Sequence, residues 1–159
     1  MMLIDTHRAI SVATSALIAL GANTLVTGNA HAELGGTMAA PQADVGSTRR
    51  VLPGSAVRVR TAVDAGGTTI NEYATSNGLI FAYGWQGPTM PDLTQLLGPY
   101  AERYRTKAAA QLDALGQLHA SRVEQPDVIV ETGGQMRSYV GRAWLPAAVP
   151  AGVSLSDLN

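Results

Sequence analysis

The chain has 159 residues, of which 46% are hydrophobic and 14% charged, and its formal net charge is −1. This balance is typical of one globular domain and excludes a disordered chain. Basic residues do not cluster beyond the pair Arg49 and Arg50, so no positive field predicts binding to nucleic acid or to an anionic membrane surface. Cysteine is absent, which excludes disulfides, a thiol nucleophile and a cysteine-ligated zinc site.

Residues 1–32 are predicted to be a cleavable secretory signal. Arg8 ends a short polar start, residues 9–22 are apolar and uncharged, and Ala30 and Ala32 are small residues at the positions that a signal peptidase admits. A membrane anchor is the alternative, but polar residues dilute the apolar run, and a stable span needs about 20 predominantly apolar residues. We therefore expect a periplasmic or secreted protein with no stable membrane span after cleavage.

Residues 33–55 contain several glycines and prolines and no sustained period, which predicts an irregular arm with at most a short strand. Residues 56–159 are expected to form a single domain. Residues 56–63 alternate apolar and polar side chains, as a strand with one buried face does. Two further strands are predicted at residues 68–75 and 79–86, joined by glycine-containing turns.

A helical apolar stripe follows the break at residues 87–91. Thr89 or Asp92 can cap the start of this helix, and Gly98 and Pro99 are expected to kink it or split it in two. The stripe recurs at three and four residues and consists of Leu93, Leu96, Leu97, Tyr100, Tyr104, Ala108, Leu112, Leu115 and Leu118.

Residues 116–126 read as a fading helix end and a loop. Strands are then predicted at residues 127–131 and 135–145, with a hairpin turn at 132–134. The order β-β-β-α-β-β predicts an α+β fold, in which an antiparallel sheet of about five strands carries one kinked helix on one face. Gly141 is expected to mark a bulge or a close backbone contact.

Residues suited to acid–base chemistry are few. His119 is the one histidine outside the signal, and a solvated helix-terminal histidine is its simpler interpretation. Glu72 and Glu131 lie on predicted strands and could meet across the sheet as a carboxylate pair, although exposed strand positions explain them as well. No ligand spacing predicts a metal ion, the glycine pairs are interpreted as turns, and no catalytic residue or cofactor is assigned.

Aromatic and arginine side chains on the third and fifth predicted strands form the best candidate binding surface. Such residues dominate protein interfaces and stack on sugars or peptide planes. The alternative is that both tryptophans belong to the core and the arginines are merely solvated, so exposure of the tryptophans decides between the two interpretations. The candidate binding residues are Trp85, Arg137, Tyr139, Arg142 and Trp144.

Several segments resemble an uncharacterised family of small exported proteins from Gram-negative bacteria, the domain of unknown function 2844. The resemblance spans most of the chain after residue 33, and it implies export and an unassigned role, with no catalytic residues to carry over. Its main segments are IFAYGWQGPTMPDL at 80–93, QLLG at 95–98, GGQMR at 133–137 and GRAWLP at 141–146.

These observations favour an exported, non-enzymatic interaction module or envelope-associated module, whose partner is a protein, a peptide or an envelope polymer. One alternative is a small periplasmic hydrolase that uses His119 or the pair of Glu72 and Glu131. The other is a structural subunit of an envelope assembly that recruits a strand at an open sheet edge.

Overall fold

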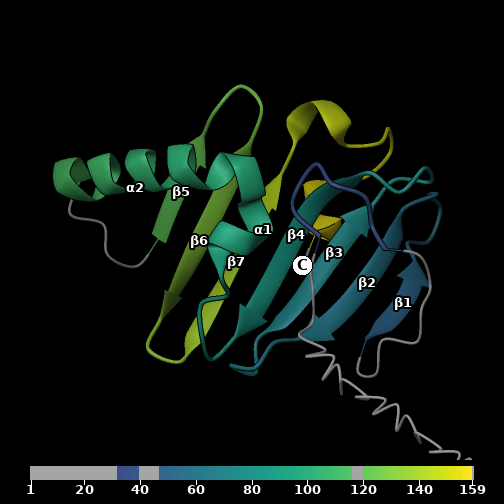
Figure 1. Cartoon of the computed structure of the whole chain (residues 1–159), viewed down its shortest axis with the longest axis horizontal. Coiled ribbons are helices and arrows are strands. Elements are labelled where there is room, and N and C mark those ends of the chain that lie inside the picture. Colours follow the sequence, from purple (N-terminus) through teal and green to yellow (C-terminus); the bar gives the residue numbers. More distant parts are fainter. Residues whose placement is uncertain (1–31, 40–46, 116–119, 159) are drawn as a thin grey trace, which may run out of the picture.

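The computed structural model describes residues 32–39, 47–115 and 120–158. Its strands form one antiparallel sheet of seven strands in the order β1-β2-β3-β4-β7-β6-β5 (Figure 1). The strands are β1 (Thr48–Val51), β2 (Arg58–Val63), β3 (Thr69–Ala74), β4 (Ile80–Gly87), β5 (Ala120–Glu124), β6 (Ile129–Gln135) and β7 (Ser138–Trp144). The predicted α+β class is confirmed, but the expected number of about five strands was too low.

The two strands beyond the predicted five lie at the edges of the sheet: β1, in the arm for which at most a short strand was predicted, and β5, which was not predicted. All four residues of β1 are exposed, and β5 buries only Val123. An edge strand with little burial shows no apolar alternation, because its pairing with a neighbour rather than a buried face holds it in place. Residues 33–55 therefore contain the short strand that the prediction allowed, whereas β5 lies where a helix end and a loop were predicted.

The meander β2–β3–β4 is found within two residues of its predicted bounds. Asp64 closes its first turn by accepting hydrogen bonds from the backbone of Gly66 and Thr68 at 2.9 and 2.8 Å. In the second turn Gly78 has a φ of 94°, a conformation that glycine adopts without strain. Strand pairing then continues from β4 to β7, so the last hairpin lies beside the meander.

Gly98 and Pro99 split the predicted helix, as expected. The parts are α1 (Leu93–Leu97), the 3-10 turn η1 (Gly98–Tyr100) and α2 (Ala101–Leu115), and Asp92 caps α1 by accepting from the backbone of Thr94 and Gln95. Only the start of the apolar stripe is buried, because Leu112 is 44% exposed and α2 runs past the sheet (Figure 1). No helix within the described ranges is long and apolar enough to cross a membrane.

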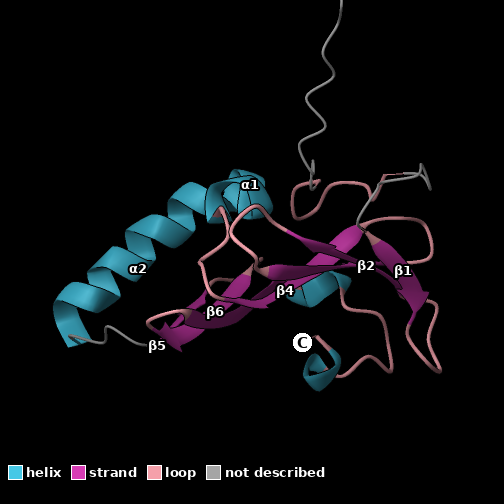
Figure 2. Ribbon diagram, turned by 90° about the horizontal axis from the view of Figure 1, so that it is seen from below, coloured by secondary structure: helices cyan, strands magenta, loops and turns pink. Residues whose placement is uncertain are grey.

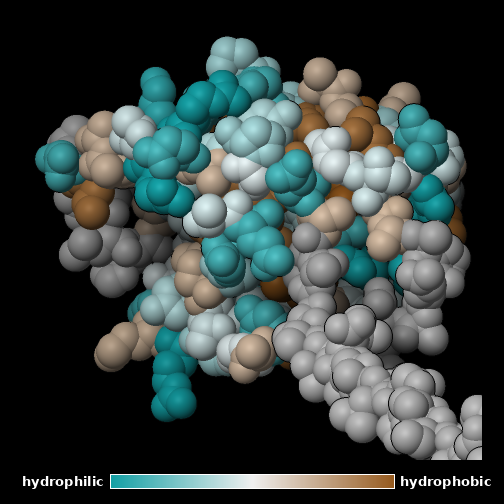
Figure 3. Space-filling view, in the orientation of Figure 1, coloured by the Kyte–Doolittle hydropathy of each residue, from teal (hydrophilic) through white to brown (hydrophobic). Residues whose placement is uncertain are grey.

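Both faces of the sheet centre are covered. The helices and residues 32–39 lie on one face, and the C-terminal segment with η2 (Pro146–Ala148) and η3 (Leu155–Asp157) lies on the other (Figure 2). The helix-side core includes Leu34, Trp85 and Leu97, and the opposite core includes Phe81 and Trp144. On the helix side the outer surface is largely hydrophilic over α2 (Figure 3).

The hairpin between β6 and β7 turns later than predicted. Gln135 pairs with Ser138, so Met136 and Arg137 form the turn, and Arg137 has a φ of 63°. Gly134 instead belongs to β6, where a Cβ atom would lie 2.3 Å from the carbonyl oxygen of Ser138. Gly134 therefore permits a close approach of two strands rather than the reversal of the chain.

Candidate functional site

Three charged side chains form a row across β5, β6 and β7, on the sheet face opposite the helices. Arg122 is paired with Glu131 in the strand register, and Glu131 with Arg142. Arg142 Nε donates to Glu131 Oε2 at 2.7 Å, and Arg122 Nη1 donates to the other oxygen of the same carboxylate. We call these three residues the Arg–Glu–Arg row.

The Trp144 ring lies under the two guanidinium groups of the Arg–Glu–Arg row, on the side of the sheet. The guanidinium carbons of Arg142 and Arg122 lie 5.4 and 5.8 Å from the centre of its ring, within the range of cation–π attraction. Arg142 also donates to the carbonyl oxygen of Leu155 at 2.6 Å, which ties the row to the C-terminal segment. These contacts orient the two guanidinium groups.

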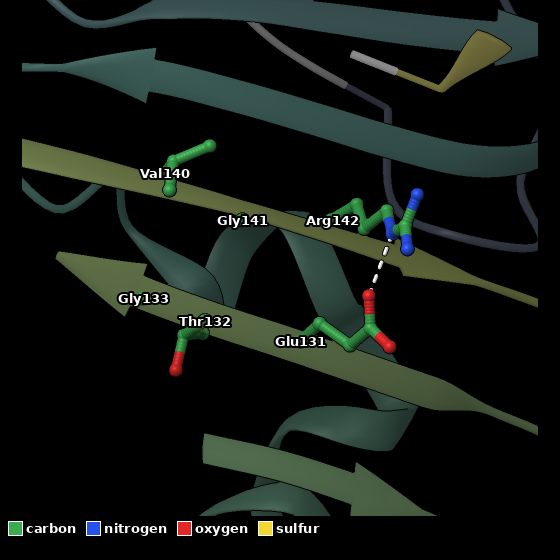
Figure 4. Close-up of a pocket in the computed structure, with 6 residues that line it drawn as sticks. All are labelled: Glu131, Thr132, Gly133, Val140, Gly141 and Arg142. Atoms are coloured by element: carbon green, nitrogen blue, oxygen red, sulfur yellow. Dashed lines mark hydrogen bonds and ion pairs between the residues drawn. The ribbon is translucent and has the colours of Figure 1, made fainter. Parts of the chain in front are cut away.

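A hollow of about 320 Å³ adjoins the row. Next to the Arg–Glu–Arg row, Gly133 of β6 is paired with Ala120 of β5 on one side and with Val140 of β7 on the other. The side chains of this second row are short or absent, whereas those of the Arg–Glu–Arg row are long. Figure 4 shows Glu131 and Arg142 pointing toward each other from neighbouring strands at one end of the hollow. Val140, at the other end, is 50% exposed. The hollow is lined by Glu131, Thr132, Gly133, Val140, Gly141 and Arg142.

The row can make hydrogen bonds to a partner. Guanidinium groups are charged at all physiological pH values and only donate, whereas a carboxylate accepts. A hydrogen bond from Arg122 to Glu124, and next one to Glu131, raises the pKa of Arg122 still further. The arrangement is therefore suited to holding a polar group beside an apolar contact rather than to moving a proton.

The five predicted binding residues do not form one surface. Trp85 and Trp144 are each 2% exposed and belong to cores on opposite faces of the sheet. Arg137 lies in the turn rather than on a strand, and Tyr139 pairs with Gly134, on the helix side. Only Arg142 belongs to the row. The burial of the two tryptophans supports the alternative interpretation, in which both belong to the core, because strands beside β4 and β7 and a layer on each face leave no open side at these positions.

Sequence reasoning missed Arg122 and gave Glu131 a different role. Arg122 lies in the segment ASRVE, where Ser121 and Val123 alternate with charged residues. That short alternation was the available signal for a strand, and it places Arg122 and Glu124 on one face.

A second polar cluster is buried on the helix side. Arg60 Nη2 pairs with Glu72 Oε2 at 2.9 Å, and the Tyr83 hydroxyl lies 3.1 Å from the same oxygen. The side chains of Arg60 and Glu72 are 6% and 0% exposed. Burial, and next the negative charge of Glu72, raise the pKa of Tyr83 far above its ordinary value of 10.0.

This cluster predicts a loss of stability in alkali. The unfolded chain releases the Tyr83 proton near pH 10, whereas the folded protein keeps it, so the free energy of unfolding should fall as the pH rises above about 10. Urea unfolding between about pH 9 and pH 11 measures the slope. Tyr83→Phe removes the Tyr83 contribution, and an unchanged slope in this variant would contradict the assignment to Tyr83.

Glu72 and Glu131, which the sequence left open as a possible carboxylate pair, do not meet. In the strand register Glu72 is paired with Tyr83, Tyr83 with Ala143, and Ala143 with Val130. Glu72 and Val130 are therefore on the same face of the sheet. Glu131 follows Val130 in β6, and successive side chains of a strand point to opposite faces, so Glu72 and Glu131 lie on opposite sides of the sheet. His119 lies outside the described residues. Within those residues no group of three or more histidine or acidic side chains could hold a metal ion.

The fold and the Arg–Glu–Arg row define a small α+β protein with a candidate binding surface on one open sheet face. The model of the family described as "Protein of unknown function (DUF2844)" matches residues 30–158, and the chain belongs to this family. The family resemblance inferred from the sequence is thereby confirmed. No curated protein and no solved structure gave a significant match.

Proposed function

We propose that the protein is an exported, non-enzymatic binding module, and that the open face of β5, β6 and β7 contacts its partner. The observation that carries the proposal is the Arg–Glu–Arg row, which is held in place beside a hollow on β6 and β7 and borders the C-terminal segment at Leu155. The secretory signal predicted at residues 1–32 supports a periplasmic or secreted address.

The partner that suits this face carries both hydrogen-bonding and apolar groups. Arg122 and Arg142 offer donors, Glu131 offers acceptors, and Val140 offers exposed apolar surface. A protein, a peptide or an envelope polymer presents such groups side by side. A hydrolase built on Glu72 and Glu131 is not supported, since the two carboxylates are separated by the sheet.

Site-specific photo-crosslinking in growing cells tests this proposal. A photoreactive amino acid at Val140 probes the open face, and the same residue at Val63 is the control, because both valines are 50% exposed and Val63 lies on β2, away from the row. We expect a discrete crosslinked product from position 140 and none from position 63. Equal products from both positions, or none from position 140, would refute the proposed surface.

Among the described residues, β1 has no strand on its outer side, and this sheet edge gives a second candidate function, the recruitment of a strand from an envelope partner. All four residues of β1 are exposed. At the opposite edge, in contrast, the carbonyl oxygen of Arg122 on β5 accepts a hydrogen bond from Gln111 of α2 at 2.9 Å. A third photoreactive probe at Val51, which is 59% exposed, distinguishes the two: products from position 51 alone would favour the edge over the open face.

A further inference from the structure

The first described residues of the chain are part of the core. Leu34 is 1% exposed and Met38 8%. The backbone nitrogens of Leu34 and Gly35 donate to the carbonyl oxygens of Leu96 and Ile80, both at 2.9 Å. This docked segment begins one residue after Ala32, the residue at which the secretory signal is expected to end.

Ala32 itself contacts the buried cluster of Arg60, Glu72 and Tyr83. The Tyr83 hydroxyl donates to the carbonyl oxygen of Ala32 and also lies 3.1 Å from Glu72 Oε2. Because Glu72 is paired with Arg60, its carboxylate can only accept hydrogen bonds, and so can the carbonyl oxygen of Ala32. A hydroxyl has only one proton to donate, so in the uncut chain two acceptors compete for it.

We propose that cleavage after Ala32 completes this cluster, because the new α-ammonium group of Glu33 takes the place beside Tyr83 and Glu72 that the Ala32 carbonyl takes in the uncut chain. The proposal rests on the export proposed above. A signal peptidase supplies the catalysis and water is the co-reactant: the C–N bond between Ala32 and Glu33 breaks, and the hydroxyl of water joins the Ala32 carbonyl carbon. The nitrogen keeps its hydrogen and gains two protons, the other proton of water and the one that the new Ala32 carboxyl group releases, so the products are a carboxylate and an ammonium group.

The geometry of the peptide unit places the new α-ammonium group of Glu33 within reach of the Tyr83 hydroxyl. The Glu33 nitrogen is bonded to the same carbon as the Ala32 oxygen, by bonds of about 1.33 and 1.23 Å. An ammonium group has three donors and no acceptor. It can donate to the Tyr83 oxygen, which leaves the Tyr83 proton for Glu72. The carboxylate of Glu33, an exposed residue, lies close enough to act on Tyr83 electrostatically and balances part of the added positive charge.

The structure also sets the order of events. Proteases cut exposed, extended chain, but in the docked state Leu34 is buried and its backbone is hydrogen-bonded to α1. The bond between Ala32 and Glu33 is therefore cut before residues 33–38 dock. Docking of the free N-terminus then follows cleavage.

The test uses the protein purified after export. Lys107 is the only lysine in the sequence, so in a Lys107→Arg variant the α-amino group is the sole primary amine. The rate of its acetylation is measured by mass spectrometry in buffer and in urea. We expect acetylation at least about tenfold slower in the folded protein than in the unfolded one, consistent with an opening cost of about 1.4 kcal/mol or more.

Acetylation in urea followed by refolding gives a second readout, because it removes the charge. We expect a lower urea midpoint for the acetylated protein, and a smaller shift in Tyr83→Phe, which lacks the hydroxyl. Equal acetylation rates in buffer and urea, or an unchanged midpoint, would overturn this inference alone. An N-terminus at Met1 or Met2 would overturn it together with the proposed export, and one at a residue other than Glu33 after export would overturn the cleavage site.

Discussion

Replacing Glu72 by glutamine is expected to lower the free energy of unfolding by about 3–5 kcal/mol, the typical cost of leaving a buried charge without its partner. The substitution keeps the shape of the side chain and removes its charge, while the Arg60 guanidinium, 6% exposed, keeps its own. The Tyr83 hydroxyl also loses a charged acceptor at 3.1 Å. Urea unfolding at neutral pH, followed by tryptophan fluorescence, measures the effect.

Glu131→Gln is the matched control for Glu72→Gln. It removes the same charge from a carboxylate that also pairs with arginine, but its side chain is 25% exposed, on the other face of the sheet. Water screens that pair, so we expect a loss of about 1 kcal/mol or less. Arg60→Met combined with Glu72→Leu should recover most of the stability that Glu72→Gln loses. Equal losses for the two glutamine variants would show that the Arg60–Glu72 pair is not buried in solution.

Gly141→Ala is expected to destabilise the protein by about 1–3 kcal/mol, the range for an overpacked core. A Cβ atom at Gly141 would lie 2.4 Å from Cζ2 of the Trp85 indole and 2.6 Å from the backbone oxygen of Glu131. Trp85 and Gly141 are partners in the register between β4 and β7, so the indole lies over the backbone where a larger residue would need room. The free energy of unfolding in urea measures the loss.

A double-mutant cycle with Trp85→Phe separates this clash from a general loss of strand stability. A phenyl ring lacks the Cζ2 atom that meets the added Cβ, so Gly141→Ala should cost less in the Trp85→Phe background than in the native protein. If the two costs are equal, the contact between Trp85 and Gly141 does not limit the residue at position 141.

The predicted site was harder to obtain from the sequence than the fold. Residue types alone suggested an aromatic and arginine surface, but Trp85 and Trp144 are buried on opposite faces and only Arg142 was retained. Arg122 became visible as a site residue only when β5 was found to pair with β6. Alternation shows which residues of one strand share a face, but it does not show which faces of two distant strands coincide.

The sequence by itself determined the α+β class, five of the strands, a helix that begins after Thr89 or Asp92, and the break at Gly98 and Pro99. These features depend on neighbours a few residues apart: apolar periodicity, a capping side chain, and the backbone limits of glycine and proline. The tertiary structure decided the edge strands β1 and β5, the separation of Glu72 from Glu131, and the burial of Leu34. Those features depend on strand register and on which layer covers each face, and both are set by contacts between residues far apart in the chain.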